Sequence, residues 1–417
     1  MTQDKRLIEV LTVQMSDCPE GAIGVAVSGG GDSMALLHLM MQWAKVQNRT
    51  LKIATVDHKL RPEAADEAAD VAAFCHAQGI AHQTLCWEDW NGQGNLQQAA
   101  RLARKDLLAQ WAQQNGLSAV CLGHTQDDQA ETFLMRLARG SGVDGLAAMA
   151  RKTGSNPVWL RPLLGVSRSE LREYLQRHGV SWINDPSNDD ESFDRIKFRK
   201  AQDMLDGLGL TRKRLAQTAD AMQLARHALE VETQNLAQSC VTVSELGCVT
   251  IDFIQLAQAS EELRLRLLSH AIKWVSGAHF RPRLTALKET YANLVRGTAQ
   301  TLGGCYFCFQ APDLLLVLRE TAAMPQTPVS DQPYDHRWQV EFTKSYDHLL
   351  VRSVGKDGIL QLDHWRETGL SRDIVLQLPS IWSGRDILAV PQVLKHAEFR
   401  LSLKTSPKSF VFSIVSH

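Results

Sequence analysis

The stretch Ala26–Met40, AVSGGGDSMALLHLM, places three consecutive glycines between two serines and continues directly into an apolar helical pattern. Glycines let the backbone adopt positive φ and approach a ligand closely, and Asp32 and Ser33 are good N-cap candidates for the following helix. Because backbone N–H groups converge at a helix N-terminus, phosphate or pyrophosphate would suit this turn. The alternative is a tight strand-to-helix turn without a ligand. Neither the Walker pattern nor the G-x-G-x-x-G dinucleotide fingerprint is present.

Around this stretch, apolar segments alternate with helical patterns. Three such segments precede polar clusters: Ala22–Val27, Leu51–Val56 and Ala119–Gly123. This alternation predicts βαβ units, and therefore an α/β domain with a parallel sheet over residues 1–210. The carboxyl ends of parallel strands meet at one edge, so we expect the three polar clusters to form a single site there.

The second half of the chain has a different pattern. Leucine or methionine recurs every seven residues from Leu215 to Leu236, which predicts a mostly helical domain over residues 211–320. Residues 321–335 contain three prolines and few apolar residues, as expected of a linker. Residues 336–417 are predicted to form a small mixed or β-rich domain.

The composition limits the class of protein. The 417 residues are 44% hydrophobic and 22% charged, which is typical of soluble globular chains with two or three domains. The net charge of -1 neither indicates nor excludes a nucleic-acid partner. No apolar run reaches membrane-spanning length and the first residues lack a signal-peptide pattern, so we predict a cytoplasmic protein.

Cys305 and Cys308 are the one cysteine pair with C-x-x-C spacing, which raises the alternative of metal or sulfur chemistry. The surrounding CYFCF is typical of an apolar β-segment, and no second Cys/His pair lies nearby. We therefore predict that both thiols are buried packing groups.

Carboxylates gather after the third apolar segment, in GHTQDDQAETFLMRLARG. Asp127 and Glu131 have i,i+4 spacing on one helical face, and Asp128 lies beside them. Acidic residues in a first turn can simply complement the helix dipole, which would account for one or two of the three. Three carboxylates that follow His124 at a strand end favour Mg²⁺ ligation through water.

Two groups of basic residues are candidates for binding phosphate. For each group the alternative is an ordinary charged surface that faces solvent. Arg101 and Arg104 lie on one predicted helix. Between Arg195 and Arg214, seven basic residues stand against two acidic ones, which is a plausible footprint for a phosphate backbone.

Five motifs in this order carry a family resemblance: SGGGDS, VDHKLRPEAADEA, GHTQDDQAETFLMRLARGSGVDGL, RPLLGVSR and DPSNDDESFDR. Together they resemble the tRNA(Ile)-lysidine synthetase family, a branch of the N-type ATP pyrophosphatases in the PP-loop superfamily. The resemblance implies an adenine nucleotide alpha hydrolase-like domain and a ligase that uses ATP and Mg²⁺. ATP would adenylate the carbon-2 oxygen of the wobble cytidine of CAU-anticodon isoleucine tRNA. Free L-lysine would then displace AMP to give lysidine.

The resemblance also implies roles for individual residues. ATP would be bound by Ser28, Gly29, Gly30, Gly31, Asp32, Ser33, Asp57 and His58. The catalytic residues would be Asp32, Asp127, Glu131, Arg101 and Arg104. Mg²⁺ would be held by Asp32, Asp127 and Asp128. The tRNA would be bound by Arg195, Lys197, Arg199, Arg212, Lys213 and Arg214.

Two other functions are consistent with parts of the sequence. A tRNA sulfur transferase on the same PP-loop scaffold would need reactive cysteines near the site, and Cys121 is predicted to lie inside a strand. A tRNA-binding protein without catalysis would not need polar residues at every strand end. The sequence leaves the oligomeric state open between a monomer and a homodimer.

Overall fold

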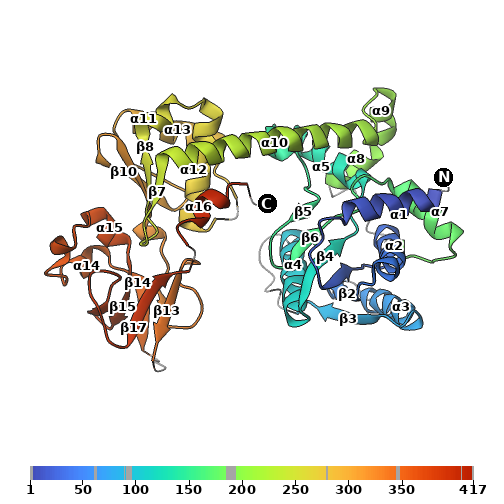
Figure 1. The fold of residues 1–417 in the computed structure, drawn as a ribbon, viewed down its shortest axis with the longest axis horizontal. Coiled ribbons are helices and arrows are strands. Elements are labelled where there is room, and N and C mark those ends of the chain that lie inside the picture. Colours follow the sequence, from blue (N-terminus) through green and yellow to red (C-terminus); the bar gives the residue numbers. More distant parts are fainter. Residues whose placement is uncertain are drawn as a thin grey trace. The chain divides into compact units, whose positions relative to one another are not determined.

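The computed structural model describes residues 3–60, 63–88, 90, 96–184, 194–278, 280–343, 348–404 and 406–415. They form two compact units, an N-terminal unit that ends at Arg226 and a C-terminal unit that begins at His227 (Figure 1). Helix α10, Arg212–Cys240, contains this boundary. The domain limits predicted at residues 210, 320 and 335 stay predictions.

The N-terminal unit is built on a six-stranded sheet of order β3-β2-β1-β4-β6-β5. Its strands are β1 (Ala22–Ala26), β2 (Leu51–Asp57), β3 (Ala81–Cys86), β4 (Leu117–Leu122), β5 (Lys152–Thr153) and β6 (Val158–Leu160). Every pairing is parallel except that of β5 with β6. The three strands predicted from the sequence are β1, β2 and β4, and the predicted parallel α/β class is confirmed.

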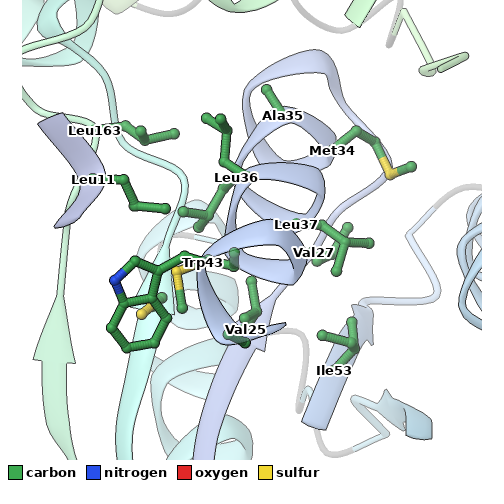
Figure 2. Close-up of a cluster of buried hydrophobic side chains, with 14 of the residues drawn as sticks. Leu11, Val25, Val27, Met34, Ala35, Leu36, Leu37, Trp43, Ile53 and Leu163 are labelled. Carbon is green, nitrogen blue, oxygen red and sulfur yellow. The ribbon is translucent and has the colours of Figure 1, made fainter. Parts of the chain in front are cut away.

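Helices precede, connect and follow these strands. They are α1 (Gln3–Gln14), α2 (Gly31–Gln47), α3 (Ala64–Ala77), α4 (Leu96–Gln114), α5 (Gln126–Ala138), α6 (Val143–Leu146), α7 (Arg168–Arg177), α8 (Asp194–Lys200) and α9 (Gln202–Gly207). Residues of α1, α2, α3 and α7 share one hydrophobic cluster with Ile23 and Val25 of β1. Figure 2 shows the part of this cluster in which α2 packs against Val25 and Ile53.

The opposite face of the sheet carries a second cluster. Ala26 of β1 packs there with Leu108 and Trp111 of α4. Trp111 lies so close to the sheet that a Cβ on Gly24 would come within 2.6 Å of its ring. Side chains of a strand alternate between faces, so β1 is buried on both sides, as a central parallel strand must be.

The C-terminal unit contains a five-stranded antiparallel sheet of order β7-β8-β11-β10-β9. Its strands are β7 (Val241–Val243), β8 (Val249–Asp252), β9 (Gln300–Leu302), β10 (Cys305–Ala311) and β11 (Leu314–Arg319). Helices α11 (Phe253–Gln258), α12 (Glu261–Ser276) and α13 (Leu284–Val295) lie between them in the chain. This region is therefore helical as predicted, but it also includes a sheet that the sequence analysis did not predict.

The rest of this unit is β-rich, as predicted. A four-stranded sheet has the order β12-β14-β15-β16, and β13 pairs with β17. The strands are β12 (Thr327–Pro328), β13 (Trp338–Phe342), β14 (Leu349–Ser353), β15 (Pro379–Ser383), β16 (Asp386–Ala389) and β17 (Phe399–Leu403). Short helices complete it: η2 (Thr321–Ala323), α14 (Gly355–Ile359), η3 (Trp365–Thr368), α15 (Arg372–Gln377) and α16 (Ser409–Phe412).

The C-x-x-C pair lies in β10, and both thiols are buried, as predicted. Residues three apart in a strand face opposite sides of a sheet. Accordingly, Cys305 packs in one hydrophobic cluster and Cys308 in another. The two sulfur atoms therefore do not face a common site.

Across the described part of the chain, every helix is too short or too polar to cross a membrane.

Candidate active site

A cavity of about 1280 Å³ opens in the N-terminal unit, at the carboxyl ends of β1, β2 and β4. Its walls contain most of the glycine-rich stretch after β1, residues 54–56 of β2 with His58 and Leu60 after it, and most of residues 122–128 after β4. The N-terminus of α7 and residues 199–213 complete the lining. The three polar clusters thus meet at one edge of the sheet, as the βαβ pattern predicts.

The glycine-rich stretch forms a compact loop. Gly29 has a φ of 80°, and a Cβ there would come within 2.6 Å of Ile183, so this position requires glycine. Ile183 in turn donates its backbone N–H to the Gly29 carbonyl at 3.0 Å. Inside the loop, Ser33 Oγ donates to the Gly30 carbonyl at 2.9 Å and accepts the Ser28 N–H at 3.1 Å.

Helix α2 begins directly at this loop. Its N-cap is Gly30, so the expectation that Asp32 or Ser33 caps it is wrong. Asp32 and Ser33 are the second and third residues of the helix, in its first turn. Because Gly30 has no side chain, the first backbone N–H groups of the helix have no side-chain cap, and the Ser33 hydroxyl donates to the Gly30 carbonyl. Uncapped N–H groups at a helix N-terminus are suited to an anion.

The acidic residues after β4 lie in the first turns of α5 and are all buried. Asp128 Oδ2 accepts the Thr125 N–H at 2.8 Å and its hydroxyl at 2.9 Å, so it forms a capping box. Asp127 Oδ2 accepts the backbone N–H of Arg168 at 2.8 Å and so caps the start of α7. These two carboxylates therefore fix helix termini within the site.

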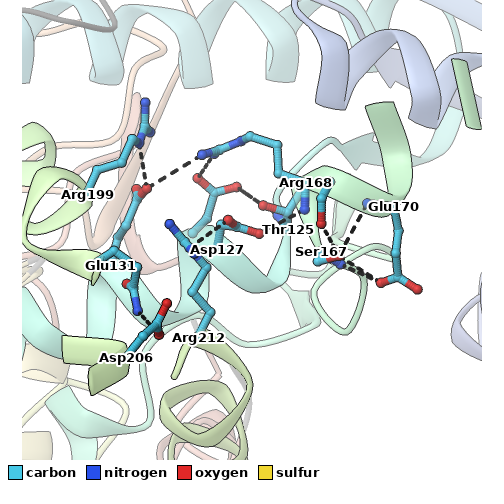
Figure 3. A network of polar contacts seen from close by, with 12 residues as sticks. Thr125, Asp127, Glu131, Ser167, Arg168, Glu170, Arg199, Asp206 and Arg212 are labelled. Carbon is cyan, nitrogen blue, oxygen red and sulfur yellow. Dashed lines mark hydrogen bonds and ion pairs between the residues drawn. The ribbon is translucent and has the colours of Figure 1, made fainter. Parts of the chain in front are cut away.

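Arg168 connects the acidic helix to the glycine-rich loop (Figure 3). Its Nε lies 2.9 Å from Asp32 Oδ2, its Nη2 lies 3.3 Å from Asp128 Oδ1 and its Nη1 lies 3.7 Å from Glu131 Oε1. Burial disfavours the charged guanidinium, but the carboxylates of Asp32 and Asp128 outweigh it and raise the pKa of Arg168. A single cation thus holds acidic groups from two separate elements.

Two further arginines reach the same carboxylates from residues 199–212 (Figure 3). Arg199 Nε lies 3.0 Å from Glu131 Oε1, and Arg212 Nε lies 3.0 Å from Asp127 Oδ1. In the structure both help to neutralise the acidic face of α5. Their predicted contact with tRNA stays a prediction.

Asp32 differs from the other acids in one respect. Its Oδ2 pairs with Arg168, whereas its Oδ1 is buried without a hydrogen-bond partner. Burial raises the pKa of Asp32, and Arg168 opposes that rise. All four carboxylate oxygens of Asp127 and Asp128 already have hydrogen-bond or ion-pair partners within the protein. The described residues contain no group of three or more His, Cys, Asp or Glu arranged for a metal. The available oxygen therefore fits a cation shared with phosphates, because Mg²⁺ commonly uses only one or two carboxylates in that setting.

The opposite wall holds His58 and Arg104. Burial and the charge of Arg104 lower the pKa of His58, and its Nδ1 is buried without a hydrogen-bond partner. Burial and the neighbouring Arg101 lower the pKa of Arg104. Asp57 is buried behind this wall, where its Oδ1 accepts the Lys59 N–H at 2.8 Å and shapes the turn after β2.

The structure brings most of the predicted residues to the cavity. Those that line it are Ser28, Gly30, Gly31, Asp32, Ser33, His58, Arg104, Asp127, Asp128, Arg199, Arg212 and Lys213. Outside its lining are Gly29, Asp57, Arg101, Glu131, Lys197 and Arg214. The side chain of Arg195 lies outside the described residues.

Arg168 is a site residue that the sequence did not reveal. It lies in the motif RPLLGVSR, to which no residue role was assigned. A local signal was present, because Ser167 and Glu170 form a capping box that marks the start of α7. That signal locates the helix but does not reveal the carboxylates that its first residue meets.

This arrangement of a glycine-rich loop at a helix N-terminus, beside an acidic helix at the same sheet edge, is that of a PP-loop nucleotide-binding protein. Residues 3–202 match the PP-loop domain family. The chain as a whole belongs to the tRNA(Ile)-lysidine synthase family, which confirms the resemblance. A tRNA(Ile)-lysidine synthase from Ruegeria pomeroyi is 39% identical over 99% of this chain and 98% of its own length. One from Wolbachia pipientis wMel is 34% identical over 89% of this chain and 88% of its own.

A solved structure with partial likeness is the U34-tRNA thiolase NcsA from Methanococcus maripaludis with its [4Fe-4S] cluster. It has a TM-score of 0.47 and 16% identity, and the match covers 53% of this chain and 79% of that one.

Proposed function

We propose that this protein is an ATP-dependent ligase that joins lysine to carbon 2 of the wobble cytidine in CAU-anticodon isoleucine tRNA. In the first step the carbon-2 oxygen of the base attacks the α-phosphorus of ATP, and the bond to pyrophosphate breaks. In the second step an amine of lysine attacks carbon 2, the bond to the AMP oxygen breaks, and AMP leaves. The lysidine family of the chain and the geometry of its cavity both support this proposal.

One observation carries the proposal: Arg168 joins the glycine-rich loop and the acidic helix in a single cavity. The loop provides a site for an anion and the acidic helix provides groups for a cationic substrate. A two-step transfer needs both at one reacting centre. Most of the rate enhancement would come from positioning and fixed charges.

The loop side of the cavity would bind ATP. Uncapped N–H groups at the start of α2 would meet the pyrophosphate, together with the hydroxyls of Ser28 and Ser33. Asp32 Oδ1 would hold Mg²⁺ together with phosphate oxygens, and the ion would neutralise charge on the departing pyrophosphate. His58 and Arg104 would face the nucleoside and its phosphate charge.

The acidic side would bind lysine. Asp127 and Glu131 would attract its ammonium groups, while Arg199 and Arg212 would exchange one carboxylate partner for another as the substrate enters. Lys213 and Arg214, at the start of α10, are exposed and would meet tRNA phosphates.

The alternative of a tRNA sulfur transferase is not better supported. The described residues that line the cavity include no cysteine. Cys121 lies in β4, as predicted, where burial raises its pKa and makes the thiolate unfavourable.

The test is to assay wild type and Asp32→Asn for AMP release and for lysidine by mass spectrometry of the wobble nucleoside. We expect Asp32→Asn to lose at least about 100-fold in rate, since the side chain loses its charge at the pyrophosphate. Asp17→Asn, at an exposed aspartate of the same unit, is the matched control and should retain activity. A normal rate of AMP release in Asp32→Asn would refute the role of the loop, and a thionucleoside product in wild type would favour the sulfur transferase.

A further inference from the structure

A second cavity, of about 340 Å³, adjoins the first and shares His58 and Leu60 with it. Its described lining consists of His58, Lys59, Leu60, Trp87, Glu88 and Trp90. Two of these six residues are tryptophans, and nothing in the proposed chemistry uses them. We call the cavity lined by these six residues the tryptophan pocket.

The tryptophan pocket is held by the ends of two neighbouring strands. Asp57 of β2 pairs with Cys86 of β3, and the register continues as Trp87 donates its N–H to the Asp57 carbonyl at 2.9 Å. One residue further, Lys59 and Glu88 form an ion pair with a distance of 2.6 Å. These contacts hold together the two strand ends from which the residues of the pocket come.

The chemistry of the lining favours a flat aromatic guest. The rings of His58 and Trp87 meet edge to face, with centroids 6.0 Å apart. Trp90 and Leu60 are 41% and 47% exposed, so large apolar groups face solvent at the rim. The charges of Lys59 and Glu88 neutralise each other. Exposed aromatic side chains beside a nucleotide cavity are the usual platform for unpaired bases.

The position of the pocket's opening favours a base of RNA over the adenine of ATP as the guest. Lys59, Leu60, Glu88 and Trp90 are all exposed, so the pocket faces solvent and not the sheet. The larger cavity already has room for ATP at the strand ends. A base that enters that cavity for adenylation must bring its chain neighbours to the rim, where His58 and Leu60 lead into the tryptophan pocket.

We propose that the tryptophan pocket stacks an unpaired anticodon-loop base that neighbours the modified one. This inference rests on the proposed function, because it takes the RNA as substrate. It adds a base-binding subsite to the cavity that performs the reaction. The subsite would hold the loop open while the wobble base is in the larger cavity.

The first test measures binding of a CAU anticodon stem-loop RNA to the full-length protein. Trp90→Ala should weaken binding about tenfold, since stacking on an aromatic side chain contributes at this level, whereas Trp90→Phe should retain most of it. Val46→Ala, which truncates an apolar side chain 78% exposed near the far end of α2, is the control and should bind normally. ATP affinity should be unchanged in all three variants.

The second test locates the base. A series of stem-loops, each lacking one loop base, is titrated into wild type and Trp90→Ala. At one position next to the wobble base, removal should weaken binding to wild type about tenfold but leave binding to Trp90→Ala unaffected. Equal effects on both proteins at every position would overturn the inference, and so would a loss of ATP affinity in Trp90→Ala, which would assign the pocket to adenine. An inactive wild type would instead refute the proposed function, because these measurements depend only on binding.

Discussion

Replacing Arg168 by methionine should destabilise the N-terminal unit by about 3 kcal/mol at neutral pH. The change removes the guanidinium but keeps an apolar chain of similar length. The Arg168 side chain is only 17% exposed, and its partners Asp128 and Glu131 are 9% and 8% exposed. Removal of one partner from a buried ion pair typically costs about 3–5 kcal/mol. We expect a cost at the lower end of this range, because Asp128 keeps its hydrogen bonds to Thr125 and Glu131 keeps its ion pair with Arg199.

The loss should depend on pH in a defined direction. Burial already raises the folded-state pKa of Asp32 and Arg168 opposes that rise, so the loss of Arg168 should raise this pKa further. A raised folded-state pKa penalises the folded protein at pH values above the unfolded-state value, which is about 4. The penalty disappears as Asp32 becomes protonated in both states. The difference between wild type and Arg168→Met should therefore be largest near pH 7 and should shrink towards pH 4.

The assay measures the free energy of unfolding by equilibrium urea denaturation at several pH values, monitored by circular dichroism. The two compact units can unfold in separate transitions, so the relevant one is identified as the transition that ATP shifts. Arg151→Met is the matched control, because its ion pair with Asp17 is 35% and 41% exposed and should contribute less than about 1 kcal/mol. Equal losses in the two variants, or a loss in Arg168→Met that stays constant with pH, would refute this account of the site.

Two further predictions concern the cysteines and the basic segment. The double variant Cys305→Ala, Cys308→Ala should retain its tRNA-modifying activity per amount of folded protein. The reason is that both thiols are buried, and burial raises both pKa values to about 12. Loss of activity in the folded variant would instead support the sulfur transferase alternative. Alanine at Lys213 and Arg214 should flatten the dependence of log tRNA affinity on log salt by up to about 2 units, roughly 0.9 or less for each phosphate contact. Arg212→Ala should have a smaller effect on that slope, because Arg212 pairs with Asp127; equal slopes in wild type and the Lys213/Arg214 variant would show that these cations face solvent only.

Much of the N-terminal unit follows from local sequence. Apolar segments flanked by helical patterns identified β1, β2 and β4, because each buried parallel strand is recognisable within a few residues. The i,i+4 spacing of Asp127 and Glu131 placed both on one face of α5 for the same reason. The position of the site at the strand ends then follows from the rule that parallel strands share one carboxyl edge.

Elements with weak local signals were not predicted. Strands β7 and β9 have three residues each and β5 has two. An alternating pattern of apolar and polar residues cannot be recognised in so few positions. Each of these strands pairs with the strand that follows it in the chain, β5 with β6, β7 with β8 and β9 with β10. The five-stranded sheet of the C-terminal unit was therefore not predicted as a sheet, although the apolar β-segment around Cys305 and Cys308 forms its strand β10.

The motifs alone determined the class of the protein and identified part of the lining of its cavity, because glycines, caps and helix faces act over a few positions. Only the tertiary structure decided which charges meet. Arg168 is separated from Asp32 by 136 residues and from Asp128 by 40, and no spacing rule links them. Likewise, Arg199 and Arg212 were indistinguishable in sequence from the exposed cations beside them, yet they pair with Glu131 and Asp127. The partner of a charged side chain depends on which surfaces the packed helices bring together, and that is a property of the whole fold.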